Sequence, residues 1–335
     1  MNAAAPVTVL GAGSWGTALG LLLARNGHAV RLWGHDPAEV AALCGDRENR
    51  RYLPGVPFPA ALHAGSDLAE AVAGSALALV AVPSHAYGET LARLRVHLSP
   101  RISLAWATKG LEPGSGRFLH QVAAELLGQA WPTAVISGPS FAREVALGLP
   151  TAVTVAARDT AHARRVAAWL HGSNLRAYTS TDVIGVELGG AIKNVLAIAA
   201  GIADGLGFGA NARAALITRG LAEMARLGLA AGGQRETFMG LAGIGDLVLT
   251  CTDDQSRNRR FGLALGRGEK AETAFAAIGQ VVEGAATVRE ALRLARHYRV
   301  DMPIAEQVDR VLHHGQNPRR AVESLLARDP KPEIL

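Results

Sequence analysis

Short apolar runs, bounded by glycine, proline and serine, recur through the first 180 residues of the chain. Runs of this length predict strands that are buried on both faces, as in a parallel sheet. We place them at residues 7–10, 30–33, 76–82, 102–106, 134–136 and 152–155. Helical patterns lie between them at residues 17–25, 87–96, 117–127 and 161–170. Strands that alternate with helices predict a doubly wound α/β sheet with parallel strands.

The pattern changes near residue 182, after which the strand signals disappear. Helical stretches separated by glycine clusters follow at residues 187–203, 211–227, 256–266, 284–298, 303–313 and 317–327. The sequence therefore predicts an α/β domain at residues 1–180 and an all-helical domain at residues 181–335. A chain of 335 residues is long enough to form two hydrophobic cores.

Composition narrows the class of protein. A net charge of +5 and an aromatic content of 5% do not fit a dedicated nucleic-acid-binding protein, whereas mild positive charge suits anionic small molecules. No uninterrupted apolar run is long enough to span a bilayer, and residues 1–30 lack the features of a secretory signal. We therefore expect a cytoplasmic protein without stable membrane insertion. Cys44 and Cys251 stand far apart, which predicts neither a disulfide framework nor a metal site.

A glycine motif follows the first predicted strand. Gly11, Gly13 and Gly16 form the pattern Gly-x-Gly-x-x-Gly, and a predicted helix comes directly after it. In a dinucleotide-binding turn the first glycine permits the tight turn, the second lets a pyrophosphate approach the backbone, and the third lets the helix pack close to the strand. An ordinary glycine-rich turn is the alternative. The strand-to-helix context favours a Rossmann-type domain that binds NAD or NADP, with the phosphates at the helix N-terminus.

The end of the second predicted strand bears on the choice between these two cofactors. An acidic residue at this point would bind the ribose hydroxyls of NAD. Here the strand is followed by Gly34, His35 and Asp36, and Arg31 is nearby. A cationic or donor side chain ahead of the acid favours a 2′-phosphate, so we predict a preference for NADP(H), with NAD(H) as the alternative cofactor. The other interpretation is that His35 only caps a loop.

Two lysines are candidates for the chemistry. In residues 188–203 only Lys193 and Asn194 are polar, and a helix that is apolar all round is buried. Burial lowers the pKa of a lysine and suits a general acid or base, but Lys193 could instead snorkel or pair with a carboxylate such as Glu187. Lys109 follows the predicted strand at 102–106, at the edge of the sheet where ligands bind, and its alternative is a solvated loop lysine.

Two further loops are expected in the same cleft. Residues 137–142 offer hydroxyls and backbone N–H groups after a predicted strand, and residues 240–246 form a glycine-rich turn that ends in Asp246. Arginines follow at 257–260, and the planar guanidinium matches a phosphate in a bidentate way. Because three arginines cannot all point in one direction, we expect Arg259 or Arg260 to lie on a solvated helix face.

Nine stretches in a fixed order now suggest a family. They are residues 11–17, 82–85, 107–112, 137–142, 187–194, 207–213, 245–251, 256–260 and 281–284. With these stretches the chain resembles the bacterial NAD(P)-dependent glycerol-3-phosphate dehydrogenases over about residues 6–325. The resemblance implies reversible reduction of dihydroxyacetone phosphate to sn-glycerol 3-phosphate, which supplies glycerophospholipid synthesis.

The same resemblance implies roles for individual residues. Lys193 would donate and accept the proton, with Lys109 and Asp246 holding the carbonyl and the lysine in place. Substrate contacts are implied for Lys109, Gly138, Ser140, Lys193, Asn194, Asp246, Thr250, Ser256, Arg257 and Asn258. Cofactor contacts are implied for Ser14, Trp15, His35, Lys109, Ala142, Arg257, Val281 and Glu283, beside the three motif glycines Gly11, Gly13 and Gly16.

Two rival functions remain at this point. The β-hydroxyacid dehydrogenases, which include 6-phosphogluconate dehydrogenase, also join a Rossmann domain to a helical one. Their active helix resembles Lys-x-x-x-Asn, whereas Asn194 directly follows Lys193 here, and this spacing counts against them. A catalytically silent NADP-sensing protein is the other rival, although such a protein has no need for a buried lysine facing the cofactor. A homodimer is expected only from the frequency of two-fold assemblies.

Overall fold

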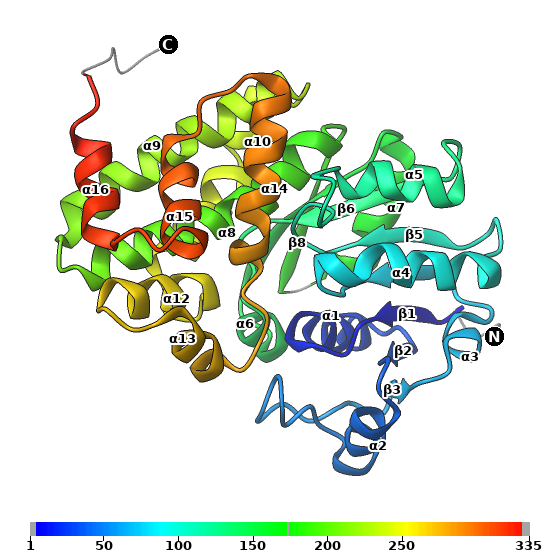
Figure 1. Ribbon diagram of the computed structural model, residues 1–335. Coiled ribbons are helices and arrows are strands. Elements are labelled where there is room, and N and C mark those ends of the chain that lie inside the picture. The colour runs from blue at the N-terminus through cyan, green and yellow to red at the C-terminus, as the bar shows by residue number, and fades with distance from the viewer. Residues whose placement is uncertain (1–4, 173, 330–335) are drawn as a thin grey trace.

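The computed structural model describes residues 5–172 and 174–329. Its N-terminal part is an eight-stranded sheet in the order β3-β2-β1-β4-β5-β6-β7-β8 (Figure 1). The strands are β1 (Val7–Leu10), β2 (Val30–Trp33), β3 (Leu62–Gly65), β4 (Leu77–Val80), β5 (Ser103–Trp106), β6 (Thr133–Ser137), β7 (Thr151–Ala156) and β8 (Leu175–Ser180). The connecting helices are α1 (Ser14–Arg25), α2 (Pro37–Asp46), α3 (Leu68–Val72), α4 (Ser84–Leu94), α5 (Leu119–Leu127), α6 (Ala142–Leu147) and α7 (Thr160–Leu170), with a 3₁₀ turn at Arg95–His97.

All six predicted strands and the four predicted helices of this part are confirmed. Strands β3 and β8 were not predicted. In β3 only Leu62 is buried, and in the edge strand β8 only Leu175 is, so neither has an apolar run. Helices α2, α3 and α6 were also missed, because α3 and α6 are too short to show a helical repeat and α2 buries only Val40 and Leu43.

The prediction that all strands are parallel is wrong at one position. Strand β7 runs antiparallel to β6, and β8 then runs parallel to β7. The connection between β6 and β7 contains only the six-residue helix α6, which is about 9 Å long at the usual rise of 1.5 Å per residue. A parallel crossover needs a longer connection. The chain therefore stays at the edge where β6 ends, and β7 returns from there.

The glycine motif joins β1 to α1 as expected of a dinucleotide-binding turn. Gly11 has φ +116°, in a region that favours glycine, and a Cβ on Gly16 would lie 1.8 Å from the carbonyl oxygen of Gly11. A Cβ on Gly13 would meet no atom within 4 Å. The first and third glycines are thus required by the turn and the close helix packing, while the second faces open space.

The described residues after β8 are helical. The helices are α8 (Val183–Gly205), α9 (Gly209–Ala230), α10 (Arg235–Phe238), α11 (Asp246–Thr252), α12 (Arg257–Gly266), α13 (Ala271–Ile278), α14 (Glu283–Tyr298), α15 (Pro303–His313) and α16 (Pro318–Leu326), with a π-helical turn at Leu241–Gly245. The six helices predicted for this part are confirmed. Helices α10, α11 and α13 and the π-helical turn were not predicted.

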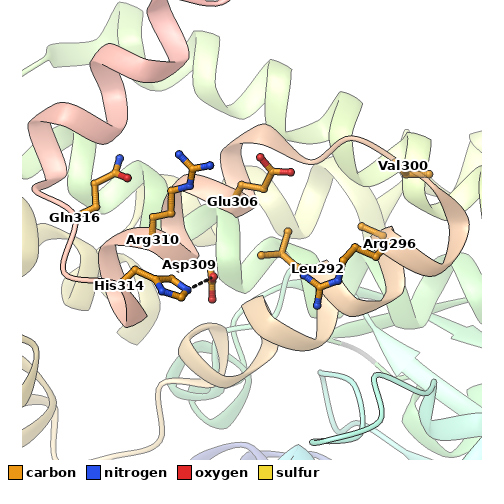
Figure 2. A pocket seen from close by; sticks show the side chains of 9 residues that line it. Leu292, Arg296, Val300, Glu306, Asp309, Arg310, His314 and Gln316 are labelled. Carbon is orange, nitrogen blue, oxygen red and sulfur yellow. Dashed lines mark hydrogen bonds and ion pairs between the residues drawn. The ribbon is translucent and has the colours of Figure 1, made fainter.

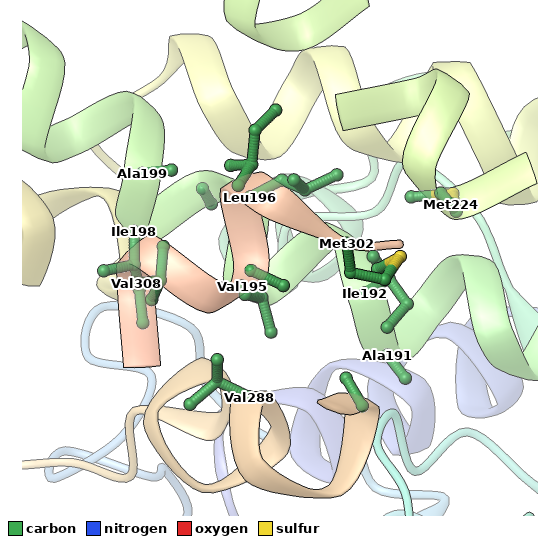
Figure 3. Close-up of a cluster of buried hydrophobic side chains, with 14 of the residues drawn as sticks. Ala191, Ile192, Val195, Leu196, Ile198, Ala199, Met224, Val288, Met302 and Val308 are labelled. Carbon is green, nitrogen blue, oxygen red and sulfur yellow. The ribbon is translucent and has the colours of Figure 1, made fainter. Parts of the chain in front are cut away.

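Helix α8 is the centre of the helical part. Its N-cap Asp182 accepts a hydrogen bond from the Gly185 amide at 2.8 Å. Buried side chains of α8, among them Ile192, Val195 and Leu196, pack with residues from α9, α14 and α15, as Figure 3 shows. In the described part of the chain α8 is the one helix long and apolar enough to cross a membrane, and 94% of that stretch is buried inside the protein.

Candidate active site

A cavity of about 1290 Å³ extends from the glycine turn to helices α8, α12 and α14. Its lining contains most of the residues singled out from the sequence: Gly11, Gly13, Ser14, Trp15, His35, Lys109, Ser140, Ala142, Lys193, Asn194, Thr250, Ser256, Arg257, Asn258, Val281 and Glu283. Three predicted residues, Gly16, Gly138 and Asp246, are not part of the lining. Gly16 packs on Gly11, and Asp246 is completely buried behind two lysines.

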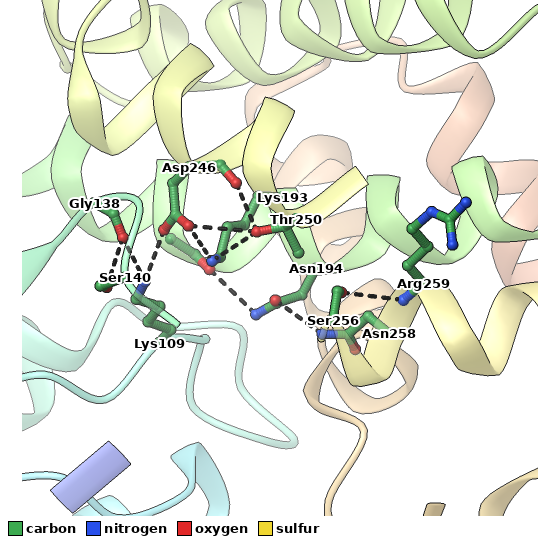
Figure 4. A network of polar contacts seen from close by, with 11 residues as sticks. Lys109, Gly138, Ser140, Lys193, Asn194, Asp246, Thr250, Ser256, Asn258 and Arg259 are labelled. Atoms are coloured by element: carbon green, nitrogen blue, oxygen red, sulfur yellow. Dashed lines mark hydrogen bonds and ion pairs between the residues drawn. The ribbon is translucent and has the colours of Figure 1, made fainter. Parts of the chain in front are cut away.

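An Asp246 carboxylate between two ammonium groups forms the centre of the polar network in Figure 4. Lys193 donates to Asp246 Oδ1 and, at 3.0 Å, to Thr250 Oγ1. Lys109 donates to Asp246 Oδ2 at 2.7 Å and to the carbonyl oxygen of Gly138 at 3.1 Å. The loop after β5, helix α8 and helix α11 therefore meet at one carboxylate.

Burial and the neighbouring charges shift the pKa values of Lys193 and Asp246 in this network. Burial lowers the pKa of Lys193 to about 7, opposed by the attraction of Asp246 and assisted by repulsion from Lys109. Burial acts to raise the pKa of Asp246, but the ammonium groups of Lys109 and Lys193 outweigh it and hold that pKa below its usual value. A lysine with a pKa near neutrality, lining a cavity and hydrogen-bonded to a fixed carboxylate, is suited to proton transfer.

The position of Asp246 follows from the glycines around it. Asp246 begins α11 directly after the π-helical turn. A Cβ on Gly189 of α8 would lie 2.2 Å from the carbonyl oxygen of Ala242, so this turn contacts the backbone of α8. Thr250, one turn along α11, donates to the carbonyl oxygen of Asp246 at 2.6 Å. The glycines thus bring the carboxylate within hydrogen-bond distance of Lys193.

Glu187, the partner weighed for Lys193 from the sequence, is engaged elsewhere. Its carboxylate accepts from the backbone amide of His120 at 2.9 Å and contacts His120 Nδ1 at 2.5 Å. Lys193 does pair with a carboxylate, that of Asp246, and Lys193 also lines the cavity. The ion pair is thus present, and it is compatible with a role of the same side chain in proton transfer.

Two asparagines extend the network toward helix α14. Asn258 Nδ2 donates to Asn194 Oδ1 at 2.9 Å, and Asn258 Oδ1 accepts from the amide of Gly284 at 2.9 Å. Asn194 Nδ2 donates in turn to the carbonyl oxygen of Gly190 at 3.2 Å. Both amides are buried, and their orientation is fixed by these contacts.

Sequence reasoning gave no role to Gln280 or Ser84, although Ser84 lies in the family stretch at residues 82–85. Gln280 Oε1 accepts from Arg257 at 3.2 Å and lies 3.4 Å from the hydroxyl of Ser14, so it joins the arginine of α12 to the glycine turn. Ser84, at the start of α4, donates to Glu283 Oε2 at 2.8 Å. Local patterns do not show these contacts, because the partners are at least 23 positions away in the sequence.

The end of β2 differs from the expectation in one respect. His35 is exposed and lines the cavity, and Asp36 is used as the N-cap of α2, where it accepts from Ala38 and Glu39. Arg31 does not line the cavity. It donates to carbonyl oxygens of Glu70, Ala71 and Ala73 instead. Arg93 of α4 does line the cavity, and its guanidinium lies 5.4 Å from the centre of the Trp33 ring at the end of β2.

A second cavity, of about 620 Å³, lies between α14 and α15 (Figure 2). Arg296, Arg310, Glu306 and Asp309 line it together with aliphatic side chains, and Asp309 pairs with His314. It contains none of the residues predicted to act in binding or catalysis.

Comparison with known proteins places this geometry in a family. The N-terminal model of the NAD-dependent glycerol-3-phosphate dehydrogenases matches residues 6–163, and their C-terminal model matches residues 182–323. A glycerol-3-phosphate dehydrogenase [NAD(P)+] of Thioalkalivibrio sulfidiphilus is 63% identical over 98% of this chain and 99% of the relative. One of Nitrosococcus oceani is 60% identical over 97% of this chain and 94% of the relative.

Solved structures agree with this result. The crystal structure of glycerol-3-phosphate dehydrogenase from Coxiella burnetii has a TM-score of 0.94 and 51% sequence identity, covering 97% of this chain and 99% of that one. The predicted resemblance is confirmed, and the α/β sheet followed by helices is the fold that it implied. The chain belongs to the NAD-dependent glycerol-3-phosphate dehydrogenase family.

Proposed function

We propose that this chain catalyses the reversible, NAD(P)H-dependent reduction of dihydroxyacetone phosphate to sn-glycerol 3-phosphate. The observation that carries the proposal is Lys193, which lines the cavity while its ammonium is held by Asp246 and Thr250. The names of the curated relatives support the same activity and the use of NAD or NADP. In the cell the product would supply glycerophospholipid synthesis.

The glycine turn fits a dinucleotide. Gly13 leaves room for a pyrophosphate, and α1 begins at Ser14 with no side chain capping its N-terminus. The rest of the cofactor would be held by other residues of the cavity lining, namely Ser14, Trp15, His35, Ala142, Val281 and Glu283. When bound, the reduced nicotinamide supplies the hydride for the ketone carbon.

Lys193 would donate the proton to the ketone oxygen during reduction and accept it during oxidation. Asp246 keeps the ammonium aimed into the cavity, and Lys109, held by the same carboxylate, would bind the substrate oxygen beside Gly138 and Ser140. Because Asp246 is buried and its pKa is lowered, it stays ionised and does not compete for the proton.

Arg257 would bind the substrate phosphate. The rest of the substrate on the side away from the reacting carbonyl would be bound by Asn194, Thr250, Ser256 and Asn258. Arg257 is partly buried, which lowers its pKa but leaves it charged at neutral pH. Binding energy from the phosphate then positions the carbonyl at Lys193.

Replacing Arg257 by alanine is expected to raise KM for dihydroxyacetone phosphate by about 100-fold with a smaller change in kcat, because a charge-assisted phosphate contact is lost. Steady-state kinetics at saturating NADPH measure both constants. Arg267→Ala, an exposed arginine at the end of the same helix, is the control and should leave KM unchanged. An unchanged KM in Arg257→Ala would exclude it as the phosphate ligand.

NADP(H) is proposed as the preferred cofactor because His35 and Arg93 line the cavity at the end of β2 while Asp36 is used as a cap. Changing His35 to aspartate should lower the ratio of kcat/KM for NADPH to that for NADH by about tenfold, since the new carboxylate repels a 2′-phosphate. His63→Asp, on the exposed side of β3, serves as the control. If the ratio does not change, His35 has no part in cofactor choice.

Three wider features are part of the proposal. The domain division is placed at residue 180, because β8 ends at Ser180 and α8 begins at Val183. The protein is proposed to work in the cytoplasm as a homodimer, without membrane insertion, with α8 serving as a core helix.

The reaction is tested by following NADPH absorbance with dihydroxyacetone phosphate, in parallel with the reverse assays of 6-phosphogluconate and 3-hydroxyisobutyrate. We expect rapid NADPH consumption with dihydroxyacetone phosphate and no activity with the other two compounds. Activity with either of those would favour a β-hydroxyacid dehydrogenase. Absence of all three activities, with NADPH still bound, would favour a sensing protein.

A further inference from the structure

Arg259 is a buried arginine next to the substrate-binding residues, and of the two arginines expected to include a solvated one, Arg260 is the one on the surface. Arg260 is exposed, whereas Arg259 is only 7% exposed. Its guanidinium pairs with Asp204 at 2.6 Å and with Asp254, and its Nε donates to the carbonyl oxygen of Cys251 at 3.0 Å. An arginine withdrawn from water in this way is stable only because its charge and its donors are paired.

We propose that Arg259 is a positioning residue, which through its ion pair with Asp204 holds residues 256–258 in the orientation that binds the substrate phosphate. The proposal rests on the proposed function of this site. It adds Arg259 and Asp204 to that function, although neither lines the cavity. Four observations support it.

The first observation is the spacing of the charges on α8. Lys193 and Asp204 are eleven residues apart, which places them on one face of the helix, about 16 Å from each other. Lys193 pairs with Asp246, the first residue of α11, and Asp204 pairs with Arg259 in the first turn of α12. The segment of α11 and α12 is therefore fixed to α8 at two points, one at the reacting end and one at the phosphate end.

The second observation is the close approach of the two helices between these points. A Cβ on Gly201 of α8 would lie 2.1 Å from the carbonyl oxygen of Arg259. A Cβ on Gly262 of α12 would lie 2.1 Å from the carbonyl oxygen of Ile198. With backbones in contact, a shift of the Arg259 end moves the start of α12 as a unit.

The third observation links Arg259 directly to the substrate residues. The backbone amide of Arg259 donates to Ser256 Oγ at 3.2 Å, the N-cap contact of α12 seen in Figure 4. Arg257 and Asn258 lie between these two residues. The guanidinium contacts to Cys251 and Asp254 join Arg259 to the segment before Ser256, so the Arg259 side chain bridges the turn that holds residues 256–258.

The fourth observation concerns the charge of Asp204. Arg213 of α9 donates to both of its carboxylate oxygens at 2.9 Å, so Asp204 lies between two arginines. Residues 207–213 belong to a stretch that marks the family but contribute no side chain to the cavity lining. The pairing with Asp204 gives Arg213 of this stretch a structural role. Loss of the Asp204 charge would leave two guanidinium groups facing each other.

The test compares Arg259→Gln and Asp204→Asn with the control Arg267→Gln. Asparagine retains an oxygen acceptor for both arginines, so Asp204→Asn removes the charge with the least change in packing. We expect KM for dihydroxyacetone phosphate to rise about tenfold or more in both variants. The kcat/KM for unphosphorylated dihydroxyacetone should change less than about threefold, because this substrate makes no phosphate contact. Arg259→Lys, which retains the charge, should recover part of the loss.

Equal losses with both substrates in the folded Asp204→Asn variant would overturn the proposal, since a general loss of structure affects both. No loss with either would also overturn it. A crystal structure of Asp204→Asn tests the proposal independently of activity. Residues 256–258 should be displaced relative to Lys193, and an unchanged position of this turn would contradict the proposal. If the unchanged protein does not reduce dihydroxyacetone phosphate, the proposed function fails, and the displacement still decides the positioning role.

Discussion

Replacing Lys193 by alanine is expected to lower kcat for ketone reduction by about 10³-fold or more, with little change in the affinity for NADPH. The reason is that the residue lines the cavity with an ammonium whose pKa burial lowers to about 7, as the proposed role of proton donor requires. Stopped assays at saturating substrates measure kcat, and quenching of tryptophan fluorescence by NADPH measures cofactor binding.

The matched control for this prediction is Lys270→Ala, an exposed lysine at the start of α13, which should retain full activity. Small primary amines such as ethylammonium should restore part of kcat in Lys193→Ala, since they can occupy the space left by the side chain. A kcat for Lys193→Ala within about tenfold of the unchanged protein would refute the assignment, because general acid catalysis contributes more than this.

Replacing Asp246 by asparagine is expected to lower kcat by about 10²-fold and to move the pH dependence. Reduction requires the protonated form of Lys193, so its rate falls as the pH rises through the pKa of that lysine, which is about 7. The Asp246 carboxylate raises this pKa. Its loss lowers the pKa further, so the decline in the rate of reduction should begin at a lower pH. Oxidation requires the neutral amine, and its rising limb should move to lower pH as well.

The measurement is the pH dependence of kcat in both directions, with Asp301→Asn, an exposed aspartate before α15, as the control. A shift of the declining limb to higher pH would contradict the account, because it would mean that Asp246 does not stabilise the charged lysine. An unchanged pH profile combined with a large loss of kcat would assign Asp246 to packing alone.

The sequence was sufficient for much of the fold and for the location of the site. Helix α8 is recognisable because its apolar residues cover every side, and Lys193 stands out within it for the same reason. The glycine motif is recognisable because its three positions have distinct steric requirements, which the close contact of Gly16 with Gly11 illustrates. Family resemblance then connected these local signals to residues far away in the chain.

Features that depend on long-range contacts were not predictable from local patterns. The burial of Arg259 depends on Asp204, which is 55 positions away in the sequence. Arg31 and Arg93 show the same limitation. Arg31 is close to His35 in sequence but turns away from the cavity, whereas Arg93 comes from another helix and lines it. Sequence proximity was a poor guide to side-chain direction at both positions.

The most direct test of the central claim is a crystal structure of the protein with NADP+ and sn-glycerol 3-phosphate. We predict a hydrogen bond of about 2.7–3.2 Å between Lys193 Nζ and the C2 hydroxyl oxygen of the substrate, with Asp246 still bound to the ammonium. A substrate whose C2 hydroxyl lies beyond hydrogen-bond distance of Lys193, with the ammonium contacting only Asp246 and Thr250, would contradict the account.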